Sequence, residues 1–151
     1  MSIFAPIYEA VENSLGWYNE EFSLIFTHLY DNGGYDKFGF TMILVPLIIV
    51  ALFYFAFKYP YAKKWHWGIM ILISTVIVFG FTMSFASIEI LSPQNDELMQ
   101  AYADSESGYL NFAETLPFKY SILNAGLSIL VGFLASLAMK PFSKCQMHLP
   151  F

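Results

Sequence analysis

Polar side chains set inside long apolar runs are the groups most able to do chemistry in this sequence. In the run 120–139, four small or polar residues recur at steps of four, which places them on one face of a helix. They are Asn124, Ser128, Gly132 and Ser136. Gly80 and Ser84 form a partial counterpart in the run 68–91. Because a polar group in hydrocarbon needs a partner, this face either packs helices within one subunit or lines a narrow pore around a symmetry axis.

Glu89 is the one charged residue of the run 68–91. A carboxylate near the end of a membrane span is costly unless it is hydrated or paired. Lys119 directly precedes the run 120–139 and is the nearest plausible partner. The sequence therefore leaves two interpretations open, a Glu89–Lys119 ion pair at the outer interface or an acidic ring at the mouth of a cation-conducting pore.

No motif typical of an enzyme active site or a cofactor site occurs in the chain. It lacks the HExxH zinc pattern, a phosphate-binding glycine loop, a dinucleotide fingerprint and the GxSxG nucleophile pattern. Cys145 and His148 have the spacing of two metal ligands, but two ligands do not complete a zinc site. We therefore predict a non-enzymatic protein without a metal or a cofactor.

Composition indicates the solvent around these residues. The chain has 151 residues, of which 57% are hydrophobic and only 13% are charged, whereas about 25% are charged in a typical soluble domain. Three uncharged or nearly uncharged runs are long enough to cross a bilayer as helices, which satisfy their own backbone hydrogen bonds in lipid. These are residues 38–57, 68–91 and 120–139. We predict an all-α integral membrane protein with three transmembrane helices, because a soluble bundle would need more polar surface.

The distribution of lysine predicts the orientation of these spans. Five of the seven lysines lie in the connection 58–67 and the tail 140–151, and only Lys37 and Lys119 lie on the other side. The positive-inside rule therefore makes that connection and the tail cytoplasmic, with the N-terminus outside. Lysine without arginine and the many aromatic residues suggest a bacterial gene, so we expect the inner membrane of a bacterial cell. The chain has no arginine and a net charge of −5, which argues against a nucleic-acid partner.

The external segment 1–37 carries a heptad-like stripe of apolar residues that predicts an amphipathic helix over residues 3–30, or two shorter helices divided at Gly16. The stripe consists of Phe4, Tyr8, Val11, Leu15, Tyr18, Phe22, Ile25 and Leu29. It either lies flat on the outer leaflet or packs against copies of itself or the connection 92–119. Its polar face lacks the lysine or arginine typical of interfacial helices, which favours protein contacts.

The connection 92–119 is polar and carries five carboxylates. Ser92 and Pro93 are typical of a helix start, which predicts a helix from there to about Ala103. The spacing of the acids does not match an EF-hand loop, so we interpret them as solvated side chains. The sequence thus predicts an ordered acidic segment on the outer face.

These patterns favour self-association in the lipid bilayer. We expect a non-enzymatic subunit of a homo-oligomeric assembly in the inner membrane, acting as a channel or pore. The alternative is a membrane anchor or scaffold subunit of a secretion, defence or lysis complex, which docks a protein partner through its external helices.

Overall fold

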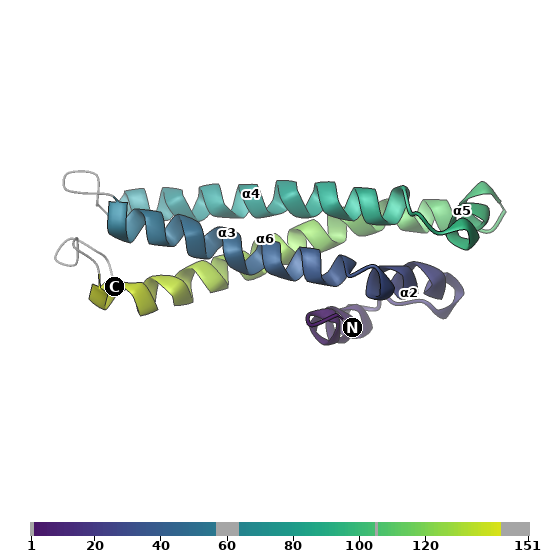
Figure 1. The fold of residues 1–151 in the computed structure, drawn as a ribbon, viewed down its shortest axis with the longest axis horizontal. Helices are drawn as coiled ribbons and strands as arrows, with labels where there is room; N and C mark the ends of the chain where they lie inside the picture. The colour runs from purple at the N-terminus through teal and green to yellow at the C-terminus, as the bar shows by residue number, and fades with distance from the viewer. Residues whose placement is uncertain (1, 57–63, 105, 143–151) are drawn as a thin grey trace. The chain divides into compact units, whose positions relative to one another are not determined.

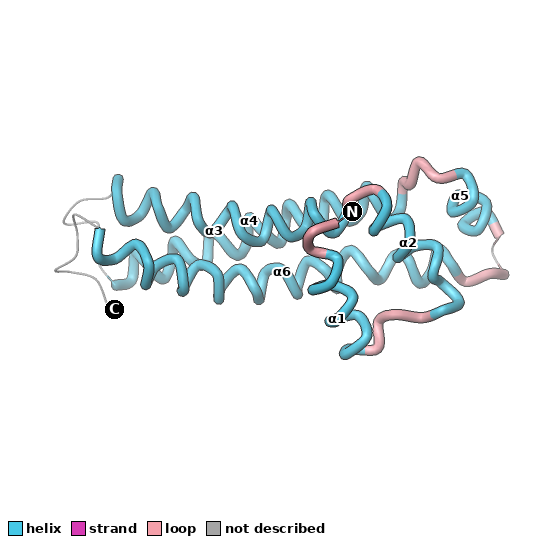
Figure 2. The backbone as a smooth tube through the Cα atoms, turned by 60° about the horizontal axis from the view of Figure 1, so that its bottom comes forward, coloured by secondary structure: helices cyan, strands magenta, loops and turns pink. Residues whose placement is uncertain are grey.

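The structure is a computed structural model that describes residues 2–56, 64–104 and 106–142. Every regular element within these ranges is helical (Figures 1 and 2). In chain order the elements are α1 (Ala5–Leu15), η1 (Glu20–Phe22), α2 (Ser23–Asp31), α3 (Gly34–Ala56), α4 (Lys64–Leu91), α5 (Asp96–Ala103), α6 (Tyr109–Met139) and η2 (Lys140–Phe142). The predicted connection 58–67 falls mostly outside the described residues, and Cys145 and His148 of the tail also lie outside them.

Three of these helices, α3, α4 and α6, are long and apolar enough to cross a membrane. For the described part of the chain, this confirms the prediction of an all-helical protein with three helices long and apolar enough to span a membrane. All three begin earlier than the apolar runs do, α4 at Lys64. α3 begins at Gly34, directly after Gly33 with its φ of 66°, and α6 begins at Tyr109, directly after Gly108 with its φ of 71°. Left-handed glycines precede the starts of α3 and α6, which the apolar runs alone do not locate.

The N-terminal stripe forms two helices and not one. α1 ends at Leu15 because Gly16 adopts a left-handed conformation with a φ of 66°. The backbone N–H groups of Trp17 and Tyr18 both donate to the carbonyl of Glu12, at 2.8 and 3.3 Å, and so complete the last turn. α2 then begins at Ser23 after the short helix η1.

The acidic helix α5 begins later than its proline suggests. The side chain of Asn95 accepts a hydrogen bond from the backbone N–H of Glu97 at 2.9 Å, so Asn95 is the N-cap in place of Ser92. The helix ends at Ala103, as predicted from the sequence. A hydrogen bond connects α5 to the end of α4, because the Tyr102 hydroxyl donates to the Ile90 carbonyl at 2.6 Å.

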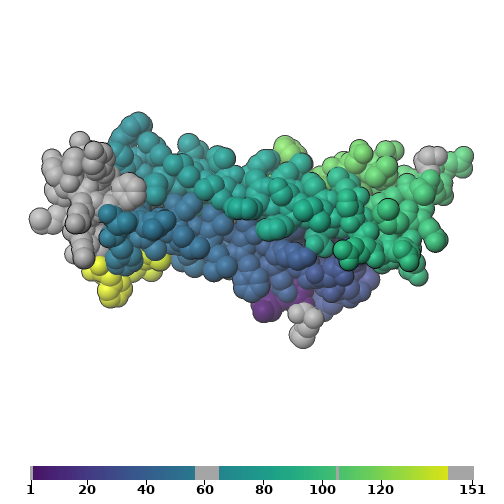
Figure 3. Space-filling view, turned by 45° about the horizontal axis from the view of Figure 1, so that its top comes forward, coloured from purple at the N-terminus to yellow at the C-terminus, as the bar shows by residue number. Residues whose placement is uncertain are grey.

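The chain divides into two compact units. Unit 1 comprises residues 1–40 and 81–121, and unit 2 comprises residues 41–80 and 122–151. Unit 1 contains α1, α2 and α5, and each of the long helices contributes one segment to each unit. The core of unit 2 consists of Val50, Phe53, Tyr54, Ile71 and Ala135. Figure 3 shows the surface to which α4 contributes, in teal and green; its exposed apolar side chains include Leu72, Val76, Phe81 and Ile88.

Candidate functional site

Asp36, in the first turn of α3, holds the N-terminus in unit 1. Its Oδ1 accepts hydrogen bonds from the Ser2 hydroxyl at 2.9 Å, the Ile3 backbone N–H at 2.7 Å and the Phe4 backbone N–H at 3.0 Å. Donors at the start of α1 are satisfied in this way by a carboxylate from another helix. The Phe4 ring then packs on Gly39, where a Cβ atom would lie only 2.2 Å from the ring. Glycine at 39 is therefore required for this close approach.

Glu12 is a buried acidic side chain of unit 1. Its residue surface is only 2% exposed, and its Oε1 accepts hydrogen bonds from two tyrosine hydroxyls. Tyr35 of α3 donates at 2.8 Å and Tyr120 of α6 donates at 2.5 Å. We call these three residues the Glu12 cluster. The Tyr8 ring stacks on Tyr35, with ring centroids 5.4 Å apart, so the cluster lies among aromatic side chains.

The environment of Glu12 favours its protonated form. Burial raises the pKa of the Glu12 carboxyl above its ordinary value of 4.5. The hydroxyls of Tyr120 and Tyr35 act in the opposite direction, and the nearby charge of Glu9 raises the pKa further. The net effect is a raised pKa. A buried carboxyl with a shifted pKa beside a cavity is a candidate functional group.

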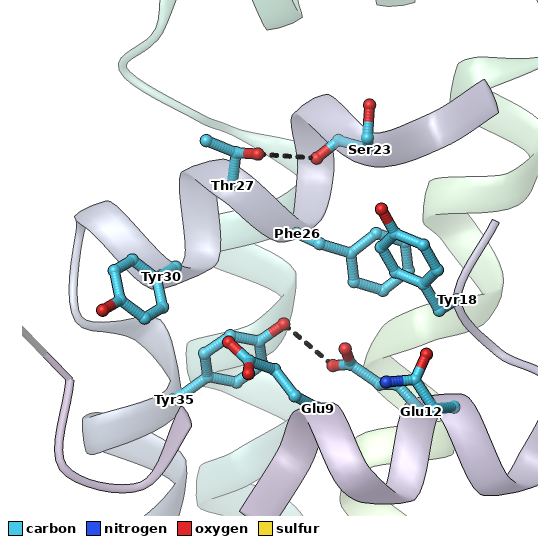
Figure 4. Close-up of a pocket in the computed structure, with 9 residues that line it drawn as sticks. Glu9, Glu12, Tyr18, Ser23, Phe26, Thr27, Tyr30 and Tyr35 are labelled. Atoms are coloured by element: carbon cyan, nitrogen blue, oxygen red, sulfur yellow. Dashed lines mark hydrogen bonds between the residues drawn. The ribbon is translucent and has the colours of Figure 1, made fainter. Parts of the chain in front are cut away.

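A cavity of about 370 Å³ opens beside the Glu12 cluster. Helix α1 contributes two carboxylates to it, from Glu9 and Glu12, and the other walls come mainly from aromatic and hydroxyl side chains (Figure 4). The lining consists of Glu9, Glu12, Asn13, Tyr18, Ser23, Phe26, Thr27, Tyr30 and Tyr35. We call it the acidic–aromatic cavity. No lysine, arginine or histidine is among these nine lining residues.

This arrangement suits recognition of positive charge better than covalent chemistry. The exposed Glu9 carboxylate supplies negative charge, and aromatic faces attract cations through their quadrupoles. Within the described residues no group of three or more His, Cys, Asp or Glu side chains is arranged to hold a metal ion. The candidate site is therefore formed by α1, the segment between α1 and η1, α2 and the first turn of α3.

The four residues of the predicted polar face of α6 lie inside unit 2. Asn124 is fully buried, and Ser128 and Ser136 are each 1% exposed. Gly132 is also buried, and a Cβ atom on it would lie 2.8 Å from Cδ1 of Ile71. The Ser136 hydroxyl accepts from Trp67 Nε1 and donates to the Gly132 carbonyl, both at 2.9 Å. The structure thus brings these residues into helix packing within one chain, whereas Gly80 and Ser84 on α4 are exposed.

The predicted pair of Glu89 with Lys119 is not formed. Glu89 instead forms an ion pair with Lys37 of α3, across 52 residues of sequence. Lys119 lies over the rings of Phe112 and Trp17, at 5.4 and 6.0 Å from their centroids. Lys119 therefore lies on α6 among aromatic side chains of unit 1, and Lys37 is the partner of Glu89.

The predicted contact stripe of the N-terminal segment packs largely on the chain itself. Tyr8, Ile25 and Leu29 are buried, whereas Leu15 and Tyr18 are 55% and 41% exposed. The remaining members are half-buried; they are Phe4, Val11 and Phe22. A partner that contacts this stripe would therefore find mainly Leu15 and Tyr18 at the surface.

Sequence reasoning missed the Glu12 cluster. Glu12 falls off the apolar stripe and so has the pattern of a solvated side chain. A weak signal was present, because Tyr8 and Glu12 are four residues apart and therefore share a helix face. The two tyrosine partners are 23 and 108 residues away along the chain, and no local periodicity relates them.

Comparison with known proteins gave no relative from which to transfer a function. No protein-family model, curated protein or solved structure matches this chain. The candidate site is therefore interpreted from its own residues and geometry.

Proposed function

We propose that this chain is a non-enzymatic, multi-pass membrane subunit that docks a positively charged protein partner through unit 1. The observation that carries the proposal is the distribution of charge. All 12 acidic residues belong to unit 1 together with two lysines, and the other five lysines belong to unit 2, giving formal charges of −10 and +5. Nine of the acids are exposed. A surface of one sign attracts partners of the opposite sign and accelerates their encounter.

The surfaces of the long helices in unit 2 suit an anchor in lipid. On α3 the exposed large side chains recur at helical spacing; they are Leu44, Ile48, Leu52 and Phe55. On α6 they include Ile129, Leu130 and Leu134. The polar face of the same helix is occupied in packing within the chain. This distribution supports an anchor that faces acyl chains with apolar groups, over a pore lined by that polar face.

The proposed orientation follows from the same charges. By the positive-inside rule, the lysines of unit 2 lie in the cytoplasm and the acids of unit 1 lie outside, with the chain in a bacterial inner membrane. The docking surface would then be the external one. Exposed acidic residues of α5, such as Asp96 and Glu97, belong to this surface.

Site-specific photo-crosslinking in cells tests this function. A benzophenone amino acid placed at Met99, which is 51% exposed on α5, is expected to capture one discrete protein with a basic surface. Neutralising Asp96 and Glu97 as D96N and E97Q should reduce that adduct several-fold. The matched control is the same probe at Leu130, an exposed apolar position of α6, which should not give the adduct. Capture of only this chain itself, or an adduct insensitive to the two substitutions, would contradict docking.

The second candidate function is the homo-oligomeric channel. The acids of unit 1 would concentrate cations at a pore mouth, and Glu89 is only partly exposed near the end of α4. Liposomes containing the purified chain discriminate between the two functions. The docking proposal predicts no cation flux and no ring of subunits. A flux that falls on Glu89→Gln, from an oligomer of defined size, would replace docking by conduction.

A further inference from the structure

We infer that the acidic–aromatic cavity binds a small organic ammonium ion. The cavity has a volume of about 370 Å³, which lies within the usual range of small-ligand sites. It is built from folded elements, because Glu9 and Glu12 come from α1 and the rings come from α2, α3 and the segment between α1 and η1. This ligand is separate from the docking of a protein partner proposed above.

The charges of the lining select a cation. Glu12 is almost fully buried, and Glu9 from the same helix is an exposed carboxylate that lines the same cavity. None of the nine lining residues is basic, so no lining side chain supplies a counter-charge. A cation that enters the cavity is attracted by the exposed Glu9 carboxylate and can contact the oxygens of Glu12, whereas an anion is repelled by Glu9.

The walls select an organic cation over a metal ion. The rings of Tyr18 and Phe26 lie next to each other, with centroids 5.1 Å apart, at one side of the opening in Figure 4, and Tyr30 and Tyr35 lie at the other. Tyr18 and Tyr30 are 41% and 39% exposed, so their rings are accessible to a ligand. Alkylammonium groups are held by aromatic faces together with a carboxylate. A calcium ion instead requires 6–8 oxygen ligands, and Glu12 Oε1 already accepts two hydroxyl protons.

Calorimetric titration of the full chain in nanodiscs tests the inference. The probes are choline and its uncharged isostere 3,3-dimethylbutan-1-ol, which has the same shape without the charge. We expect choline to bind at least about tenfold more tightly than the isostere, because carboxylate attraction and cation–π contacts act only on the charged ligand. Equal affinities for the two probes, or no binding of choline, would overturn the inference.

Matched variants show whether the cavity is responsible. Glu9→Gln and Tyr30→Leu should each weaken choline binding about tenfold, and Tyr30→Phe, which keeps the ring, should restore it. Glu114→Gln is the control. Glu114 is an exposed acid of α6 outside the cavity, so its substitution removes the same charge from unit 1 without changing the lining. If Glu114→Gln weakens binding as much as Glu9→Gln does, the attraction is general to unit 1 and the proposed site is wrong.

A competition experiment separates an organic from an inorganic ligand. Calcium ions should compete with choline only weakly, at the level expected from ionic screening of exposed charges. Displacement of choline by stoichiometric calcium would identify an inorganic cation site and overturn the assignment. The amide exchange pattern of α1 in each variant verifies that unit 1 remains folded. Failure of choline binding leaves the photo-crosslinking result at Met99 unchanged, so the two proposals fail separately.

Discussion

Unit 1 joins its helices through hydrogen bonds to charged and aromatic side chains, whereas unit 2 joins them through close apolar packing. In unit 1 Glu12 and Asp36 together accept five hydrogen bonds from other segments of the chain. In unit 2 the backbone of α6 approaches a side chain of α4 at Gly132, and the Trp67–Ser136 hydrogen bond supplements the contact. The difference matches the solvent that each unit is proposed to face. In lipid, the burial of apolar surface contributes little free energy to helix association. Close packing between helices then contributes most of it.

The largest effect expected from this comparison is the loss of the Glu12 carboxylate. Glu12→Leu leaves the hydroxyls of Tyr35 and Tyr120 buried without their acceptor and should lower the free energy of opening of unit 1 by about 3 kcal/mol. Amide hydrogen exchange of α1 measures this quantity. Glu12→Gln should lower this free energy much less, because the glutamine amide oxygen can accept both hydroxyl protons. Exposed Glu9 is the control in the same helix; a Glu9→Leu effect as large as that of Glu12→Leu would contradict the assigned role.

A pair of glycine substitutions compares the close contacts of the two units directly. Gly39→Ala places a Cβ atom 2.2 Å from the rigid ring of Phe4, whereas Gly132→Ala places one 2.8 Å from the flexible end of Ile71. We expect Gly39→Ala to cost about 1–3 kcal/mol of stability and Gly132→Ala to cost less than about 1 kcal/mol. Thermal unfolding in detergent compares the two variants. A larger loss for Gly132→Ala would reverse the ranking and contradict the account of Phe4 packing.

The pH dependence of stability separates the buried carboxyl from the exposed ones. Because the Glu12 pKa is raised above 4.5 in the folded chain, the folded state binds this proton more tightly than the unfolded state does. The contribution of Glu12 to stability therefore falls as the pH rises from 4.5 toward the raised pKa, by at most about 1.4 kcal/mol per pH unit. Glu12→Gln should remove this slope. An unchanged slope in the difference between the two proteins would assign it to other groups.

The smallest of these effects concerns the hydrogen bond between Trp67 and Ser136 in unit 2. Trp67→Phe removes the donor to Ser136 and retains an aromatic ring, so it should lower stability by about 0.6–1 kcal/mol. Exchange rates of amides in α4 and α6 should rise, while those in α1 remain unchanged. A loss comparable to that of Glu12→Leu would mean that the units do not differ in how they are held together.

The three long apolar helices were predictable from the sequence because bilayer thickness imposes a minimum length on an apolar run. The starts of α3 and α6 were not, because Gly33 and Gly108 end the preceding segments by local backbone geometry. The division of the N-terminal segment at Gly16 was one of two options that the stripe allowed, and the positive φ of this glycine decides it.

The candidate site was much less predictable than the spans. Glu12 belongs to the polar side of the stripe by pattern, and its burial depends on Tyr120, which lies 108 residues away. The Glu89–Lys37 pair could not be predicted from local sequence either, because its two residues are 52 positions apart. Periodicity reports which side of one helix is apolar, but it does not report which helix covers that side.

Cysteine accessibility tests the central claim most directly. This claim is that acidic unit 1 lies outside the cell and that the lysines of unit 2 lie in the cytoplasm. Starting from a Cys145→Ser protein, single cysteines are placed at Met99 and at Phe142, which is 76% exposed, and intact cells are treated with a membrane-impermeant maleimide. We predict labelling of Met99→Cys in intact cells and of Phe142→Cys only after permeabilisation. Labelling of both positions in intact cells, or of Phe142→Cys alone, would contradict the proposed topology.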